Sequence, residues 1–303
     1  MGVAHAGYIL TCETALRSVV PKRFRNFAYR QFIKELTYKH AQLTHPEEIL
    51  QTASIRCDRN SDLKIWLVSS RADILMAMWC LKSLFFYSKE TWDVWIADHG
   101  DINSEQMSLL EWHFPGIRIL PRNHLDAGSV GPTKPYPKST WLRHNKKFVL
   151  SLKLFDPIFN LDDGRFLLLD SDVLFFQRPF EILDMLKLQD KCIPFHFNVE
   201  ASGAINSGLA VIDKSALNLA DIERALSSMN TRQRNSWCVE QDIYTEIARG
   251  RYAVLPPLYA VQPINDDVHS NVISCHYIGV CRHAFYRQGI SRLRRQKFLE
   301  NLR

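Results

Sequence analysis

The sequence predicts an α/β fold in which a mixed, mostly parallel β-sheet is flanked by helices and preceded by a helical N-terminal extension. Between residues 63 and 120, three short apolar runs alternate with two helical stretches, which is the spacing of β-α-β units. A further run, 165–169, ends directly in an acidic pair. Strands buried on both faces of a parallel sheet are continuous apolar runs of this kind, so we expect helices on both faces.

The expected strands are short apolar runs bounded by polar residues, and they lie at 63–68, 92–97, 117–120, 165–169, 209–212 and 253–255. The expected helices lie at 74–87, 105–113, 144–159 and 216–229. Two glycines and three prolines between residues 122 and 143 predict a loop there.

The N-terminal part has a different pattern. Residues 14–55 are polar, with five apolar residues between Phe24 and Leu36 at roughly helical spacing. We expect residues 1–60 to form a helical extension that packs on a main domain of residues 61–303. No linker that would divide the main domain is evident.

The composition is that of an ordinary globular protein, with 46 % hydrophobic and 23 % charged residues in a chain of 303. The seven cysteines have no C-x-x-C spacing, so neither a zinc ribbon nor a disulfide framework is indicated. The N-terminus lacks a signal-peptide pattern, and no apolar run approaches the ~18 residues that span a bilayer. We therefore expect a cytoplasmic protein with reduced thiols.

The net charge of +6 is concentrated at the ends of the chain. Residues 1–40 hold seven basic and two acidic residues, and residues 280–303 hold seven basic residues and one acidic residue. Basic ends of this kind fit a solvated helix surface or peripheral contact with an anionic membrane. Neither end has an aromatic-basic nucleic-acid motif, so no nucleic-acid partner is expected.

Polar residues follow the first two predicted strands. Ser69, Arg71 and Asp73 follow the first strand, and Asp98 and Asp101 follow the second. Ligands of open α/β sheets bind beyond the carboxyl ends of the strands. These residues are therefore candidates for ligand binding.

The segment Asp170-Ser171-Asp172 is the strongest candidate site. A D-x-D tripeptide alone is weak, but this one follows the apolar run 165–169 and precedes the apolar run 173–176. Two carboxylates at positions i and i+2 of an extended chain face the same side and repel each other unless a cation lies beside them. Mg²⁺ and Mn²⁺ prefer such oxygen ligands.

Three further motifs follow at intervals of about 35 residues. They are a small-residue segment around Asn206, the acceptor-rich Glu240-Gln241-Asp242, and the segment from His276 to Gly279. Taken singly, each fits an ordinary structural role: a turn, charge placement at a helix N-terminus, and a core histidine.

Taken in order, the motifs resemble those of the GT-A-fold, nucleotide-sugar-dependent glycosyltransferases, and most closely the glycogenin-like and bacterial galactosyltransferase-like group, glycosyltransferase family 8. Asp170-Ser171-Asp172 matches the D-x-D of that family, and Asn206-Ser207-Gly208 resembles its F-N-S-G strand. Glu240-Gln241-Asp242 resembles its D-Q-D segment, with Glu240 where Asp is commoner. The segment from His276 to Gly279 resembles its H-x-x-G motif, although Lys-Pro-Trp does not follow. The resemblance covers roughly residues 63–290.

The resemblance implies a GT-A catalytic domain that transfers a sugar from a UDP-sugar, or a GDP-sugar, to an unknown acceptor, with retention of configuration. It implies a Mn²⁺ or Mg²⁺ ion held by Asp172 and His276, with Asp170 binding the ion or the ribose. The residues implied near the donor are Ser69, Arg71, Asp98, Lys153, Asp170, Gly279 and Arg282. Asn206, Gln241 and Asp242 are implied to face the donor sugar or the acceptor.

Three alternatives remain open at this stage. A haloacid-dehalogenase-type phosphohydrolase also has an apolar strand followed by D-x-D, and Asp266-Asp267 would supply its later acidic pair. A nucleotidylyltransferase shares the sheet and the metal, but the loop at Ser69 lacks its glycines. The third alternative is a non-catalytic nucleotide-sugar-binding protein.

Overall fold

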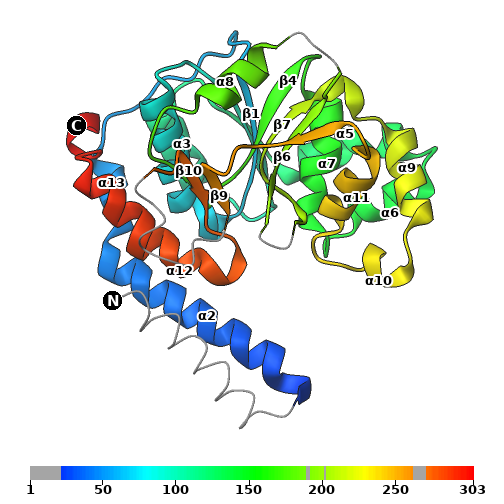
Figure 1. Ribbon diagram of the computed structural model, residues 1–303, viewed down its shortest axis with the longest axis horizontal. Helices are drawn as coiled ribbons and strands as arrows, with labels where there is room; N and C mark the ends of the chain where they lie inside the picture. Colours follow the sequence, from blue (N-terminus) through cyan, green and yellow to red (C-terminus); the bar gives the residue numbers. More distant parts are fainter. Residues whose placement is uncertain (1–21, 189–191, 201–202, 262–270) are drawn as a thin grey trace.

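The computed structural model describes residues 22–188, 192–200, 203–261 and 271–303. Its centre is a seven-stranded sheet with the order β3-β2-β1-β4-β7-β6-β8 (Figure 1). The strands are β1 (Lys64–Ser69), β2 (Asp93–Asp98), β3 (Arg118–Leu120), β4 (Arg165–Asp170), β6 (Phe195–Val199), β7 (Ile205–Asp213) and β8 (Tyr252–Val254). All neighbouring pairs are parallel except the two that involve β7. The predicted mixed, mostly parallel sheet is confirmed.

Strand β1 shows why the apolar runs are continuous. Ile65 and Leu67 point into a core on one face of the sheet, and Trp66 points into a second core on the other face. All three side chains are fully buried. Successive side chains of a strand face opposite ways, so a strand covered on both sides needs apolar residues at every position.

Helices cover both faces of the sheet (Figure 1). One face carries α3 (Ile74–Ser88), together with α4 (Ser104–His113) and α8 (Phe180–Lys187). The helices of the other face are α5 (Arg122–Thr133), α6 (Pro137–His144), α7 (Leu152–Asn160), α9 (Leu219–Ser228) and α11 (Val239–Ile247). Shorter helices are η2 (Arg71–Asp73), η3 (Val149–Ser151), η4 (Lys214–Ala216) and α10 (Thr231–Arg234).

A second, three-stranded sheet packs beside the first, in the order β5-β10-β9. Its strands are β5 (Val173–Phe175), β9 (Tyr259–Val261) and β10 (Ser274–His276). Strand β10 is antiparallel to β5, and His276 pairs with Val173. This register brings His276 next to Asp172, which is 104 residues away in the sequence.

The loop predicted over 122–143 is wrong, because α5 and α6 occupy it. Pro137 is the first residue of α6, where a missing backbone N–H has no consequence. The apolar core of that face buries Leu125 of α5 and Leu142 of α6. The helix predicted over 144–159 is also wrong in its first half, since α6 ends at His144 and α7 begins at Leu152.

The N-terminal extension begins, in the described residues, with α2 (Lys22–Thr44) and η1 (Pro46–Gln51). Ile49 of η1 is fully buried in the core beside α3, and the Trp79 indole donates to the Pro46 carbonyl at 2.8 Å. The boundary near residue 60 stays a prediction.

Helix α2 runs beside the C-terminal helices (Figure 1), which are η6 (Gly279–Cys281), α12 (Arg282–Ala284), η7 (Phe285–Ile290), α13 (Ser291–Arg295) and η8 (Glu300–Leu302). Within the described ranges, none of the helices has the length and apolar character to cross a membrane.

Candidate metal and donor site

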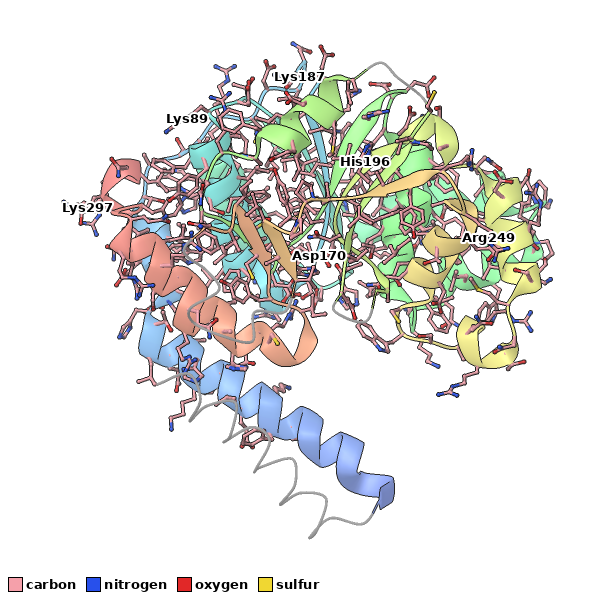
Figure 2. The ribbon with its side chains drawn as sticks, viewed as in Figure 1. Lys89, Asp170, Lys187, His196, Arg249 and Lys297 are labelled. Carbon is pink, nitrogen blue, oxygen red and sulfur yellow. The ribbon has the colours of Figure 1, made fainter. Side chains whose placement is uncertain are left out.

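The carboxyl end of β4, at Asp170, lies next to the carboxyl end of β10, at His276, near the middle of the molecule, where Figure 2 labels Asp170. Asp170 is the last residue of β4. The chain then turns at Ser171 and Asp172 before β5 begins at Val173. The expected extended conformation through Asp172 is therefore wrong, yet both carboxylates still face one histidine.

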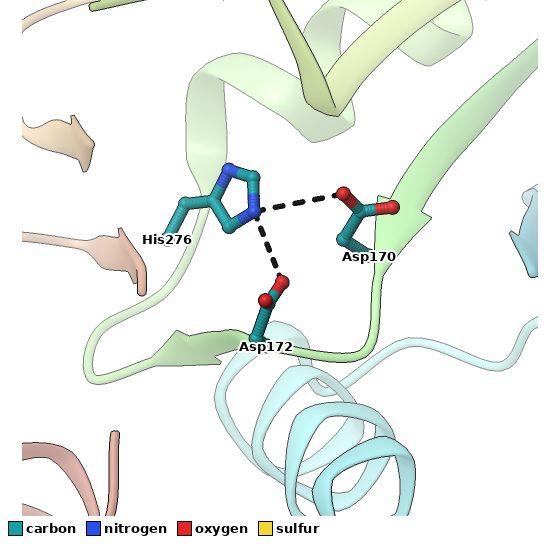
Figure 3. A group of neighbouring side chains, drawn as sticks. All are labelled: Asp170, Asp172 and His276. Carbon is teal, nitrogen blue, oxygen red and sulfur yellow. Dashed lines mark hydrogen bonds and ion pairs between the residues drawn. The ribbon is translucent and has the colours of Figure 1, made fainter. Parts of the chain in front are cut away.

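Asp170, Asp172 and His276 form a compact group, as Figure 3 shows. The Nε2 atom of His276 lies 3.0 Å from Oδ1 of Asp172 and 3.6 Å from Oδ2 of Asp170. One potential ligand atom from each residue lies within 4.8 Å of the others. His276 and Asp172 are buried, whereas the Asp170 side chain is 21 % exposed. The group is thus open to a ligand on the Asp170 side.

Asn206, on β7, determines the tautomer of His276. Its Oδ1 atom accepts from the backbone N–H of Gly208 at 2.9 Å, which identifies this atom as the amide oxygen. The same oxygen lies 2.9 Å from Nδ1 of His276, so Nδ1 must carry a proton. In the neutral imidazole, the lone pair of Nε2 then points at the two carboxylates.

This arrangement fits a divalent cation. An unprotonated Nε2 and a carboxylate oxygen 3.0 Å apart are two acceptors facing each other, and either a shared cation or an additional proton would resolve that contact. Two carboxylates with one imidazole suit Mn²⁺ or Mg²⁺ more than a soft metal. Burial raises the pKa of Asp172, but Arg282, together with His276 whenever its ring is protonated, outweighs it and holds that pKa well below its usual range. Asp172 is therefore ionised and available as a ligand.

Gly208 lies against the ring of His276. A Cβ atom at this position would lie 1.9 Å from Cε1 of His276. Only glycine permits the strand backbone to approach the imidazole this closely. This contact gives a physical reason for the small-residue segment around Asn206.

Lys153, on α7, contacts the other end of the group. Its Nζ atom lies 2.5 Å from Oδ1 of Asp170, and its side chain is buried. Burial lowers the pKa of Lys153, but the charges of Asp170 and Glu240 outweigh it and raise that pKa. The lysine therefore offsets part of the negative charge at the site.

Glu240, the first residue of the acceptor-rich segment, is buried behind the site. Its Oε1 accepts from Ser207 at 3.3 Å, and Oε2 has no partner among the described residues. Burial raises the pKa of Glu240 to about 7, although Lys153 lowers it. The three residues of this segment therefore have different surroundings. Glu240 is buried behind the site, whereas Gln241 and Asp242 line the larger cavity described below.

Arg282 joins the C-terminal helices to the site. Its Nε donates to Oδ2 of Asp172 at 2.9 Å, and its Nη1 donates to Oδ1 of Asp73 at 2.9 Å. Asp73 also accepts from the hydroxyl of Ser70 at 2.6 Å. The sequence predicts Asp73 only as a residue that follows a strand, whereas its pairing with Arg282 connects residues 209 positions apart.

Two cavities meet at this group. The larger has a volume of about 830 Å³, and the smaller has a volume of about 160 Å³. Leu150, Asp170, Asp172 and Arg282 line both cavities. The predicted site residues that line the larger cavity are Lys153, Asp170, Asp172, Asn206, Gln241, Asp242, His276, Gly279 and Arg282. Ser69 lines the smaller cavity.

Two predicted donor residues lie outside both cavities. Asp98 uses its Oδ1 to accept from the backbone N–H groups of Gly100, Asp101 and Ile102 at 2.7–3.2 Å. Arg71 is exposed, and its backbone N–H donates to Asp101. Both residues stabilise the turns after β1 and β2, so their contact with a donor stays a prediction.

Asp73, a candidate from its position after the first strand, lines the smaller cavity. Other residues that line the cavities were not among the predicted ones: His99 lines the smaller cavity, and Glu200, Trp237 and Tyr252 line the larger. His99 follows β2 directly, and this position was the signal that could have identified it. Glu200, Trp237 and Tyr252 have no motif around them, so only the fold brings them to the cavity.

No protein-family model matches the sequence, and no curated protein matches it. Solved structures do match. The galactosyltransferase LgtC, in complex with donor and acceptor sugar analogs, aligns with a TM-score of 0.51 at 15 % identity, over 79 % of this chain and 96 % of LgtC. The glycosyltransferase GlyE of Streptococcus pneumoniae TIGR4 aligns with a TM-score of 0.51 at 13 % identity, over 80 % of this chain and 64 % of GlyE.

The bifunctional glycosyltransferase WbbM aligns with a TM-score of 0.53 at 10 % identity, over 82 % of this chain. This chain spans 64 % of GlyE and 53 % of WbbM. At such identities the similarity concerns the fold, and the fold is that of the GT-A glycosyltransferases.

Proposed function

We propose that this chain is a metal-dependent glycosyltransferase that moves a sugar from a nucleotide-diphosphate donor, preferably a UDP-sugar, to an acceptor hydroxyl. The observation that carries the proposal is the convergence of Asp170, Asp172 and His276 at the carboxyl ends of the strands, between the cations Lys153 and Arg282. Ligands of open α/β sheets bind at this edge. The GT-A fold supports the same reading.

Asp170, Asp172 and the Nε2 atom of His276 are the groups that would hold Mn²⁺ or Mg²⁺. A divalent cation there would offset the charge on the departing diphosphate as a Lewis acid. Arg282 and Lys153 supply positive charge on either side of the ligands. Arg282 has several N–H groups, so it can donate charge-assisted hydrogen bonds to a phosphate as well as to Asp172.

Asp242 and Gln241 suit a role at the sugar. Both line the larger cavity, and burial raises the pKa of Asp242. Among the described residues, no side chain bonds to the Asp242 carboxylate. An unpaired carboxylate can stabilise or orient a sugar that gains positive charge as its bond to the diphosphate breaks. Asn206 acts differently, because its amide is engaged with His276 and Gly208.

We infer transfer with retention, as the family resemblance implies. The bond between the anomeric carbon and the diphosphate oxygen breaks, and the acceptor oxygen bonds to that carbon from the same face. The acceptor proton then passes to the departing diphosphate. The smaller cavity, with Ser69, is the place we assign to part of the nucleotide.

The haloacid-dehalogenase-type alternative is disfavoured by the fold. Its second acidic pair, Asp266-Asp267, lies outside the described residues. A nucleotidylyltransferase is expected to have a glycine-rich phosphate loop after β1. This chain has Ser69, Ser70 and Arg71 there, with no glycine, which disfavours that alternative.

Peripheral contact with an anionic membrane stays part of the proposal, but fewer basic residues can take part in it than the sequence suggests. Of the seven basic residues in 280–303, Arg282 binds Asp172, and Arg294 lies 3.1 Å from Glu48. Arg295, Lys297 and Arg303, together with the basic residues of 1–40, supply the charge. Sedimentation with vesicles of anionic against zwitterionic lipid tests this contact.

The function is tested by incubating the protein with a panel of UDP- and GDP-sugars and measuring released nucleotide. We expect Mn²⁺-dependent release from one donor and loss of at least about tenfold in rate in D172N. Release that persists unchanged in EDTA would refute the metal assignment. Tight binding of a UDP-sugar with neither hydrolysis nor transfer to any acceptor of a broad panel would identify a non-catalytic binding protein instead.

A further inference from the structure

The larger cavity extends well beyond the metal ligands. At about 830 Å³ it is several times larger than the neighbouring cavity at Ser69. One part of its wall is formed by α11, the loop before it and the start of β8, with Trp237, Thr245 and Tyr252 among its residues. None of these three residues is among those assigned to the metal or the donor phosphates.

Trp237 is the most prominent feature of that wall. Its side chain is 66 % exposed, more than any of the other six tryptophans. A large indole exposed at the mouth of a cavity is unfavourable in water unless a ligand covers it. The other exposed tryptophans, Trp112 and Trp141, line neither cavity.

The loop that carries Trp237 is held in place on both sides. Before it, Asn230 and Gln233 form a reciprocal cap on α10, and the N–H of Ser236 donates to the Gln233 carbonyl at 2.9 Å. After it, α11 begins at Val239. The indole is therefore presented from fixed backbone, which lowers the ordering cost of binding.

Polar groups lie around the aromatic surface. Tyr252 packs on Phe197, with ring centroids 6.3 Å apart, and its side chain is 41 % exposed. The carboxylates of Glu200 and Asp242 line the same cavity. A cavity lined by both aromatic rings and carboxylates suits a pyranose ring, which has an apolar C–H face and hydroxyl groups at its edge.

We propose that this wall is an acceptor subsite for a sugar ring, which stacks on Trp237 and donates hydroxyl protons to Glu200 and Asp242. The proposal rests on the proposed function and deepens it, because it assigns the acceptor to the carbohydrates. An acyl chain would leave the Asp242 carboxylate without a hydrogen-bond partner, whereas Glu200 already accepts from the Asn206 amide at 3.3 Å. A polypeptide acceptor is the alternative that the experiment must exclude.

The experiment uses the full chain with Mn²⁺ and the donor identified in the nucleotide-sugar panel. Three acceptor sets are compared: methyl and p-nitrophenyl glycosides of common hexoses and pentoses, peptides containing Ser, Thr and Tyr, and long-chain alcohols. We expect transfer to at least one glycoside. W237A should raise the KM for that glycoside about tenfold or more, with the KM for the donor within about twofold. W237F, which keeps an aromatic face, should raise it less.

W112A is the matched control, since Trp112 is 58 % exposed on α4 and lines neither cavity. Its kinetic constants should equal those of the wild type, and thermal melting of all three variants checks that they fold. A second readout is the tryptophan fluorescence change on adding the glycoside to the protein with UDP and Mn²⁺, which W237F should abolish.

Transfer to peptides or alcohols but not to glycosides would overturn the inference, as would an unchanged glycoside KM in W237A. Donor hydrolysis without acceptor reports the proposed function separately. A protein that hydrolyses the donor but ignores every glycoside would therefore refute the acceptor subsite alone. A protein that neither binds nor hydrolyses any donor would refute the proposed function.

Discussion

The amide oxygen of Asn206 lies 2.9 Å from Nδ1 of His276, and the N–H of Gly208 donates to the same oxygen. The Gly208 contact identifies the oxygen, and the oxygen in turn requires a proton on Nδ1. The other ring nitrogen is left to face Asp172 and Asp170. A residue pair on β7 and β10 thus leaves Nε2 of the imidazole available to the proposed metal ion.

The first prediction follows from that pair. N206L removes the acceptor that fixes the His276 tautomer, so we expect Mn²⁺ affinity to fall about 10- to 100-fold. Calorimetric titration with Mn²⁺ measures it. N123L, at an exposed position on α5, is the control and should bind as the wild type does. Equal Mn²⁺ affinity in N206L and the wild type would show that the amide does not orient the ring.

The second prediction concerns the close approach of β7 to His276. A Cβ in G208A would overlap the imidazole, so the ring must move and Mn²⁺ affinity should fall at least about tenfold. G128A is a matched control, because a Cβ on α5 meets no atom within 4 Å and alanine is favoured over glycine in a helix by about 1 kcal/mol. Metal binding by G208A at wild-type strength would contradict the geometry.

The third prediction concerns charge balance behind the site. K153M removes the buried cation that faces Asp170 and Glu240, so the free energy of unfolding should fall by about 3 kcal/mol or more. The double variant K153M/E240Q removes one buried acid as well and should recover part of the loss. Urea unfolding measures both, with the exposed Lys146 replaced by methionine as control. A double variant less stable than K153M would argue against this balance.

The fourth prediction is a pH dependence of stability. His113 is fully buried, and neither ring nitrogen has a partner among the described residues. Burial, helped by the nearby charge of Lys82, lowers the pKa of His113 from 6.5 to about 4. The unfolded chain therefore binds a proton first as the pH falls, so stability is lost between pH 6.5 and about 4, by at most about 1.4 kcal/mol per pH unit.

H113L should remove this dependence, which urea unfolding at several pH values measures. The exposed His124 supplies the control variant H124Q, whose pH profile should follow that of the wild type. If the unfolding free energies of H113L and the wild type differ by the same amount at pH 7 and pH 4.5, His113 is not the group responsible.

The sequence predicted the central strands because their environment is uniform. Strands β1 and β4 are covered on both faces, so the residues between their first and last positions are all apolar and form a recognisable run. The helices α5 and α6 were missed because glycine and proline usually break helices. In the structure, Pro137 starts a helix, and tertiary packing of Leu125 and Leu142 stabilises the segment.

The candidate site was predictable where one short motif supplies the residue, as with Asp172 and His276. It was not predictable where partners come from distant segments. Asp73 meets Arg282 only because the C-terminal helices fold back to β1, and Trp237 reaches the cavity on a loop without any motif. For Arg71 and Asp98 the sequence signal was ambiguous, because a polar residue after a strand can stabilise a turn as well as bind a ligand. In the structure both residues stabilise turns.

The most direct test of the account is the affinity of the wild type and D172N for UDP, measured by calorimetry with Mn²⁺ and again with EDTA. We predict that Mn²⁺ strengthens UDP binding to the wild type at least about tenfold and that D172N shows no such gain. A cooperative thermal unfolding transition checks that D172N is folded. UDP affinity that is the same with Mn²⁺ and EDTA, or a Mn²⁺ effect that survives in D172N, would contradict the assignment of this site.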